Sequence, residues 1–157
     1  MSAKRRGVRF GEWVTWNDRS PLPARQGGLY LFGCFRSGRP GSAPNPSRPS
    51  PEVIYVGEAK NLNERPLKQH PYVQRYADLF GDRSLDRLYV AVAPLYRTDV
   101  DHVVYRVARL HAAYWEAKLI WRYGEEHGHP PVLHFGKDTP DAPWIAQEVA
   151  ALKGRRT

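Results

Sequence analysis

The longest periodic segment of the chain runs from Asp101 to Tyr123, and it constrains the fold more than any other feature. Apolar residues recur in it at separations near three or four residues or their multiples, which is the period of one helix face. These residues are Val103, Val107, Leu110, Tyr114 and Ile120. The pattern predicts one long helix with an apolar face, which in globular proteins is turned toward the core. Gly124 is expected to end this helix.

Three shorter runs have the length and composition of β-strands. Gly28–Phe35 is apolar and aromatic, Val53–Gly57 is β-branched and aromatic, and Leu88–Ala93 is stopped by Pro94. The first two runs can form an antiparallel hairpin with an enlarged loop. We therefore expect a small α+β domain with a central antiparallel or mixed sheet of about three strands, flanked by helices.

Several shorter segments complete the expected order of elements. Asn61–His70, Tyr72–Phe80 and Pro143–Lys153 are predicted helices. Val132–Phe135 is expected to return as an edge segment, and Val8–Trp16 is either a short strand or an arm packed on the core.

The chain of 157 residues has the length of one domain. Residues 1–26 form a basic and aromatic extension, and residues 27–157 form the domain itself. Segment 37–51 is rich in proline, serine and glycine, and prolines lack the donor that a strand ladder needs. It is expected to be an exposed, mobile loop, either a disordered bulge or an arm that contacts DNA through Arg39 and Arg48.

The charge balance indicates a polyanionic partner. Lys and Arg number 24 against 16 Asp and Glu, a net charge of +8. Nucleic acid is the expected partner, an anionic membrane surface is the second choice, and an incidental composition is the third. Cys34 is the only cysteine, which excludes an intrachain disulfide and a multi-cysteine zinc site. Because no apolar run is long enough to span a bilayer, we expect a soluble cytoplasmic protein that does not enter membranes; its oligomeric state stays open.

Several residues of the chain occur in an order that is also found in a known protein family. They are Gly28-Leu29-Tyr30, Tyr55-Val56-Gly57, Asn61-Leu62, Arg65, His70 and Glu116. This order resembles the GIY-YIG nuclease superfamily, over about two-thirds of the chain from Gly28 to His134. The most specific part is YVGEAKNLNERPLKQH, in which the arginine lies ten positions after the tyrosine. The resemblance implies a GIY-YIG-like fold and a metal-dependent endonuclease that leaves a 5′-phosphate and a 3′-hydroxyl. Its role would be restriction-like, repair, mobile-element or toxin.

The chemistry of phosphodiester hydrolysis fits these side chains. The reaction must stabilise extra negative charge on phosphorus, which metal ions and arginine can do. A carboxylate such as Glu116 suits Mg²⁺ or Mn²⁺, which often keep most of their waters. By resemblance Glu116 is the metal ligand and Arg65 contacts the scissile phosphate through its planar fork of donors.

The resemblance makes one of Tyr30 and Tyr55 the group that activates water and the other a helper, and we favour Tyr30 as the base. The alternative is that both tyrosines pack in the core, since tyrosine is common in strands. His70 is an auxiliary general base. His134 stands where relatives commonly carry an asparagine, and as a histidine it can donate a hydrogen bond or bind metal.

Basic residues around these positions are expected to contact nucleic acid, with double-stranded DNA as the partner. They are Lys60, Arg65, Lys68, Arg39 and Arg48. Two other functions are open: a catalytically silent nucleic-acid-binding module of the same fold, and a protein-interaction domain whose basic charge is incidental.

Overall fold

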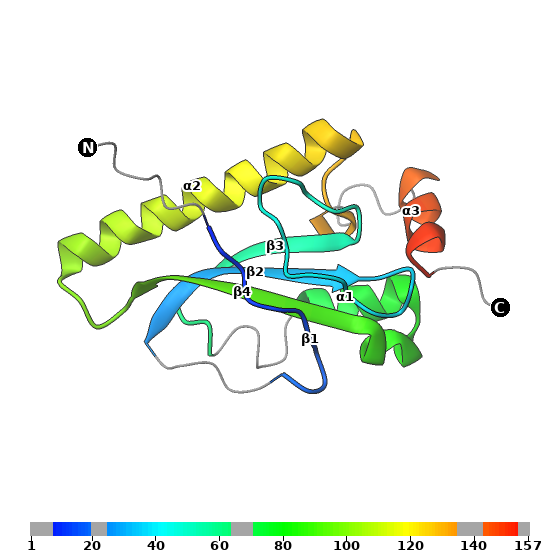
Figure 1. Ribbon diagram of the computed structural model, residues 1–157, viewed down its shortest axis with the longest axis horizontal. Coiled ribbons are helices and arrows are strands. Elements are labelled where there is room, and N and C mark those ends of the chain that lie inside the picture. Colours follow the sequence, from blue (N-terminus) through cyan, green and yellow to red (C-terminus); the bar gives the residue numbers. More distant parts are fainter. Residues whose placement is uncertain (1–7, 20–24, 64–70, 135–142, 154–157) are drawn as a thin grey trace.

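The computed structural model describes residues 8–19, 25–63, 71–134 and 143–153 (Figure 1). Its centre is one antiparallel sheet with the strand order β1-β4-β2-β3. The strands are β1 (Val14–Thr15), β2 (Gln26–Cys34), β3 (Val53–Ala59) and β4 (Leu88–Arg97). The α+β class is therefore confirmed, but the sheet has four strands where about three were expected. The additional strand, β1, comes from the N-terminal extension and pairs with the start of β4.

Helices follow the strands on both faces of the sheet. They are α1 (Pro71–Phe80), η1 (Asp82–Arg87), α2 (His102–His127), η2 (Val132–His134) and α3 (Pro143–Lys153). The helices predicted at Tyr72–Phe80 and Pro143–Lys153 are confirmed within a residue. The edge segment expected at Val132–Phe135 is instead a 3₁₀ turn as far as it is described. Residues 64–70 of the helix predicted over Asn61–His70 lie outside the described residues.

Alternation along the central strand β2 divides the core into two layers. Tyr30 and Phe32 face the layer that contains residues of α1, η2 and α3, whereas Leu29 and Leu31 face the layer beneath α2. Because β2 has a partner strand on each side and a layer on each face, its side chains are almost completely buried. In Figure 1, α2 runs along one long side of the sheet and α3 lies near one end.

Strand β4 continues through Pro94, so the prediction that this proline stops the strand is wrong. The register between β2 and β4 shifts between Gly27 and Gly28, and Leu95 is the extra residue on β4. Prolines are tolerated in sheets at such bulges and where a strand lacks a neighbour on one side. Pro94 meets both conditions. It lies next to the bulge at Leu95, and β1 pairs only with Tyr89 and Val90 and so does not reach it.

Helix α2 is longer than the sequence pattern indicates. It begins after Asp101, whose side chain accepts a hydrogen bond of 2.9 Å from the Val103 backbone N–H. It continues through Gly124, the predicted stop, and ends before Gly128, whose φ of 79° is the left-handed conformation of a helix C-cap. No helix within the described segments, α2 included, combines the length and apolar composition needed to cross a bilayer.

Of the five residues of the predicted apolar face, Ile120 packs against the core layer beneath α2, and the other four are exposed. Val103, Val107, Leu110 and Tyr114 are between 56% and 72% exposed. The buried residues of α2 are instead Ala112, Leu119 and Tyr123. Their spacing of seven and four residues also defines one helix face. That face includes Glu116, so the sheet-facing side of α2 is the one that carries the candidate metal ligand.

Candidate active site

The pairing of β2 with β3 brings the two tyrosines of the motif together. Tyr30 lies opposite Gly57, and Phe32 lies opposite Tyr55. Because residues two apart on a strand share a face, Tyr30 and Tyr55 lie on the same side of the sheet. The centres of their rings are 5.8 Å apart, and both residues belong to the buried core layer beside α1 and η2. Core packing, which was the alternative interpretation of these tyrosines, is therefore part of their environment.

Gly57 makes room for the phenol of Tyr30. A Cβ atom on Gly57 would lie 2.4 Å from Cζ and 2.6 Å from the hydroxyl oxygen of Tyr30. No side-chain carbon fits at those separations, so the ring of Tyr30 crosses β3 directly above the glycine backbone. Gly57, which ends the second tripeptide, must therefore lack a side chain so that the ring of Tyr30, which ends the first tripeptide, can pack against β3.

The environment of Tyr55 favours its protonated form. Burial is the largest of several causes that raise the pKa of Tyr55 far above its ordinary value. The others are Tyr30, through charge and a hydrogen bond, and the charges of Tyr72 and Glu116. The hydrogen bond joins the hydroxyl groups of Tyr30 and Tyr55, and it is one of the causes that keep Tyr55 neutral.

Glu116 supplies a carboxylate to the same group from α2. Its side chain is half-buried, and its charge acts on the Tyr55 phenol. Across the described part of the chain, no three His, Cys, Asp or Glu side chains gather into a preformed metal cage. Mg²⁺ does not need such a cage, because one or two carboxylates with waters and substrate phosphates commonly hold it. The carboxylate of Glu116, whose charge reaches Tyr55, is an oxygen donor of the kind that Mg²⁺ or Mn²⁺ uses in such a site.

His134 positions Tyr55 and completes the edge of the sheet. The backbone N–H of Val56 donates a hydrogen bond of 3.0 Å to Nε2 of His134. The imidazole also stacks on the Tyr55 ring, with ring centres 4.6 Å apart and an angle of 15° between the planes. Because Nε2 accepts from a backbone amide, the ring proton is on Nδ1, and Nε2 is not available to donate or to bind a metal.

Burial of His134 predicts a dependence of stability on pH. Burial, with a smaller contribution from Arg75, lowers the pKa of His134 to about 4, whereas the unfolded chain keeps a value near 6.5. The unfolded state therefore binds more protons between these values, and the free energy of unfolding falls as pH decreases from 6.5 to 4. This loss amounts to about 3 kcal/mol. His134→Asn is expected to remove that part of the pH slope in urea unfolding.

His102→Asn serves as the control, because His102 is exposed at the start of α2. It is expected to keep the slope of the natural protein. An unchanged slope in His134→Asn would contradict the assignment of the buried neutral imidazole.

Three of the predicted site residues lie outside the described residues: Arg65, Lys68 and His70. Their roles as phosphate contact, nucleic-acid contact and auxiliary base stay predictions. Lys60 is described; it is exposed and directly follows β3. The structure therefore brings together Tyr30, Tyr55, Glu116 and His134 from four elements and places Lys60 beyond the end of the strand that carries Tyr55.

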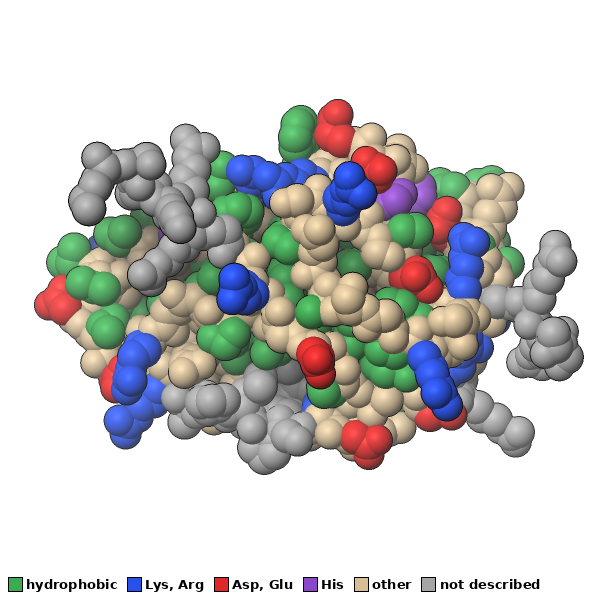
Figure 2. Space-filling view, in the orientation of Figure 1, with side chains coloured by type: hydrophobic (Ala, Val, Ile, Leu, Met, Phe, Trp, Pro, Cys, Tyr) green, Lys and Arg blue, Asp and Glu red, His purple; other side chains and the backbone are tan. Residues whose placement is uncertain are grey.

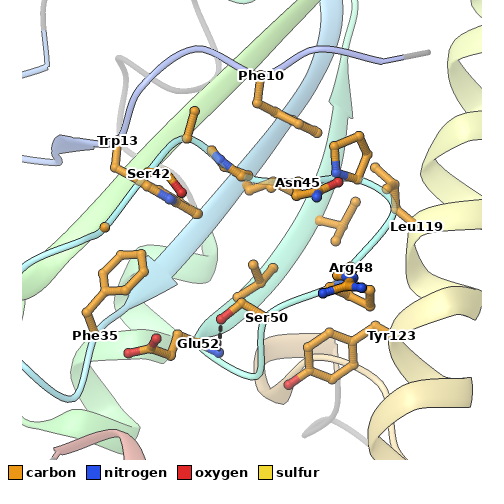
Figure 3. A pocket seen from close by; sticks show the side chains of 18 residues that line it. Phe10, Trp13, Phe35, Ser42, Asn45, Arg48, Ser50, Glu52, Leu119 and Tyr123 are labelled. Carbon is orange, nitrogen blue, oxygen red and sulfur yellow. Dashed lines mark hydrogen bonds between the residues drawn. The ribbon is translucent and has the colours of Figure 1, made fainter.

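Arg39 and Arg48 lie on the proline-rich loop, which covers the opposite face of the sheet. With α2 and the N-terminal segment, this loop encloses a cavity of about 270 Å³ (Figure 3). Phe10 and Trp13 line it from the N-terminal segment, and Leu119 and Tyr123 line it from α2. Arg48 also lines the cavity, while its side chain is exposed. Arg48 thus lies over the α2 layer, Arg39 is exposed earlier in the same loop, and the tyrosines belong to the other layer.

The loop is anchored to α2 through its backbone. The carbonyl oxygens of Pro46, Pro49 and Pro51 pair with Arg122, His127 and Tyr123, at distances of 2.9, 2.8 and 3.2 Å. The loop that was expected to be an exposed bulge or arm is therefore held against α2 by these three bonds. Proline removes a donor but keeps its carbonyl acceptor, and side chains of α2 use that acceptor.

The aromatic residues of the N-terminal segment have a packing role. Trp16 is buried and meets Phe32 edge to face, with ring centres 5.6 Å apart. Trp13 meets Phe35 in the same manner at 5.1 Å. The arm that was expected to pack on the core does so, and it also contributes the short strand β1.

Positive charge is not gathered on one side in the view of Figure 2. On the face shown there, lysine and arginine side chains alternate with acidic ones over the sheet and helices. This face therefore shows no single basic patch.

Two residues near the site were not predicted from the sequence. The ring of Tyr72, in the first turn of α1, lies 4.3 Å from that of Tyr55. Arg109 lies on the sheet-facing side of α2, two turns before Glu116, and its Nε is 3.5 Å from a carboxylate oxygen of Glu58. Arg109 could have been found from the sequence, because a spacing of seven residues places it on the same helix face as Glu116. Nothing in the local pattern indicates Tyr72.

Comparison with protein-family models finds no matching family, and no curated protein and no solved structure matches the chain. The resemblance to GIY-YIG nucleases therefore depends on the residues of the motif and on their positions relative to one another.

Proposed function

We propose that this protein is a divalent-metal-dependent endonuclease that hydrolyses phosphodiester bonds in DNA. The observation that carries the proposal is the convergence of Tyr30, Tyr55 and Glu116 from β2, β3 and α2, with a hydrogen bond between the phenols and the carboxylate charge acting on Tyr55. The net charge of +8 supports a polyanionic substrate.

In this proposal Tyr30 is the general base. Tyr55 is held in its neutral form and shares a hydrogen bond with Tyr30, so Tyr30 is assigned the role of base and Tyr55 that of the helper. In its phenolate form, Tyr30 takes a proton from the attacking water as the water oxygen bonds to phosphorus. The bond between phosphorus and the 3′-oxygen breaks, and the departing 3′-oxygen takes a proton from solvent water, which gives a 5′-phosphate and a 3′-hydroxyl.

Glu116 holds the cation in this scheme. The cation, when bound, supplies charge stabilisation for the phosphoryl group. His134 keeps the Tyr55 ring in place by stacking and by its bond to the β3 backbone, so it acts as a positioning residue. Arg65, outside the described residues, is assigned to the scissile phosphate by resemblance alone.

Cleavage of supercoiled plasmid tests the proposal directly. With Mg²⁺ or Mn²⁺ we expect nicked and then linear DNA, and with EDTA we expect none. The ends are expected to be religated by DNA ligase without prior phosphorylation, because each carries a 5′-phosphate. Tight, salt-sensitive binding without any cleavage would instead identify a silent nucleic-acid-binding module. Equal cleavage in EDTA would contradict the metal requirement.

A further inference from the structure

Helix α2 exposes a continuous apolar stripe along most of its length. The stripe consists of Val103, Val107, Leu110, Tyr114, Ala117 and Trp121. Its five large members are between 56% and 72% exposed. Hydrophobic side chains gather at the end of the molecule where α2 begins, on the left of Figure 2. The domain core does not use this stripe, because α2 packs on the sheet through Ala112, Leu119 and Tyr123.

The spacing within the stripe is that of a helix that pairs with another helix. Its members follow one another at steps of four, three, four, three and four residues. A strict alternation of this kind, with a mean of 3.5 residues, is the heptad pattern of coiled-coil seams. The stripe is narrow and lies opposite the sheet-facing side of α2, so a second helix can approach it from the solvent side.

The exposed area is large for a monomer. The stripe presents on the order of 700 Å² of surface, whereas the largest apolar patch of a typical monomer is about 300–600 Å². A standard stable interface buries roughly 800 Å² on each partner. One further helix of the same length is therefore enough to cover the stripe and reach the size of a specific interface.

We infer that the stripe is the interface of a homodimer in which the α2 helices of two copies pack antiparallel about a two-fold axis. The sizes of the side chains support a second copy as the occupant. The aliphatic residues Val103, Val107 and Leu110 form the first half of the stripe, and both aromatic residues lie in the second half. Antiparallel pairing sets each aromatic ring against an aliphatic side chain, Trp121 against Val103 and Tyr114 against Leu110, with Val107 opposite Ala117.

A groove lies where this pairing places the largest side chain. It lies between the first turns of α2 and β4, with a volume of about 430 Å³. It is lined by Leu95, Val103, Val104, Val107, Ala108 and His111. Trp121 of the second copy lies opposite Val103 in the antiparallel register, so its indole enters this groove. By symmetry each copy provides one groove and one indole, which makes the interface self-complementary.

The aromatic centre of the stripe is held in place before association. The ring of Tyr114 meets that of Trp115 edge to face at 5.9 Å, and the ammonium of Lys118 lies 5.5 Å from the centre of the Tyr114 ring. The indole N–H of Trp115 donates to Nε2 of His111 at 3.1 Å. A side chain that is already ordered loses less entropy on binding, which favours association.

Sedimentation equilibrium tests the dimer, and the inference does not depend on the proposed nuclease activity. The natural protein is expected to reach twice the 18.0 kDa of one chain at micromolar concentration. Leu110→Lys and, independently, Trp121→Lys are expected to raise the dissociation constant at least about tenfold, with no loss of melting temperature in the monomer. Glu126→Lys is the control. It changes the charge of the chain more than either stripe variant does, but the exposed side chain of Glu126 lies off the stripe. A natural protein that stays monomeric, or a dimer unchanged by both stripe variants, would overturn the inference.

Cysteine cross-linking tests the orientation of the helices. A Val103→Cys protein and a Trp121→Cys protein are mixed and oxidised with glutathione disulfide; the natural Cys34 is buried and does not compete. Antiparallel packing is expected to give a disulfide between the two different variants. Disulfides between two copies of Val103→Cys would require parallel helices and would contradict the arrangement.

Discussion

Glu116→Gln is expected to lower the rate of metal-dependent DNA cleavage by about 10²–10³-fold while the melting temperature stays within a few degrees. Glutamine keeps the shape of the side chain and removes the charge that holds a cation. The charge of the half-buried carboxylate raises the pKa of the Tyr55 phenol, so its removal relieves this repulsion. Initial rates of plasmid nicking at saturating Mg²⁺ measure the first effect, and thermal unfolding measures the second.

Glu125→Gln is the matched control for this result. It makes the same chemical change at an exposed position of the same helix, nine residues further on. Its cleavage rate is expected to equal that of the natural protein. Cleavage that survives in Glu116→Gln at an undiminished rate would refute the assigned role of Glu116, whatever the oligomeric state of the chain.

Gly28→Ala is expected to destabilise the fold strongly, although it adds only one methyl group. A Cβ on Gly28 would lie 2.1 Å from the carbonyl oxygen of Ala93 and 2.9 Å from the backbone nitrogen of Leu95. Both atoms belong to the backbone of β4 in the middle of the sheet, so no side-chain rotation relieves the contact. We expect a loss of about 3 kcal/mol in the free energy of unfolding and a fall of roughly 10 °C in melting temperature.

Gly124→Ala, the same substitution at another glycine, is expected to have the opposite effect on stability. A Cβ on Gly124, within α2, would have no atom within 4 Å. Alanine is favoured over glycine inside a helix by about 1 kcal/mol, so this variant is expected to be more stable than the natural protein. Urea unfolding of both variants measures the contrast. Equal stability of Gly28→Ala and the natural protein would mean that β2 and β4 do not pair in the register described.

Much of the sheet could be predicted because its strands are local patterns. The runs that became β2 and β3 are dense in β-branched and aromatic residues and are bounded by glycine and proline. The meeting of Tyr30 and Tyr55 follows from pairing these two strands as a hairpin. Strand β1 has only two residues, and so short a segment carries no periodic signal; only its pairing with β4 identifies it.

The orientation of α2 could not be predicted, because periodicity identifies a face but not what that face contacts. The most regular apolar face points to solvent, and the side that packs on the sheet mixes Ala112 and Leu119 with the polar Arg109 and Glu116. Polar groups on a packed face lower its apolar contrast, so a pattern analysis selects the opposite side. A helix with two partner surfaces therefore misleads any method that assumes one core.

The remaining site residues depend on contacts between distant parts of the chain. His134 and Val56 are 78 positions apart and meet only because η2 returns to the edge of β3. The stacking of Tyr72 on Tyr55 likewise requires the packing of α1. Local sequence placed His134 in the candidate site through resemblance, but its bond to a backbone amide came from the structure alone.

The anchoring of the proline-rich loop has a consequence for how its sequence can vary. All three anchoring bonds to α2 use carbonyl oxygens of the loop, and every amino acid supplies that atom. These three bonds therefore do not depend on the side chains of the loop. A substitution at Arg39 or Arg48 keeps all three, so the exposed charge of the loop can change without altering the scaffold that holds the tyrosines.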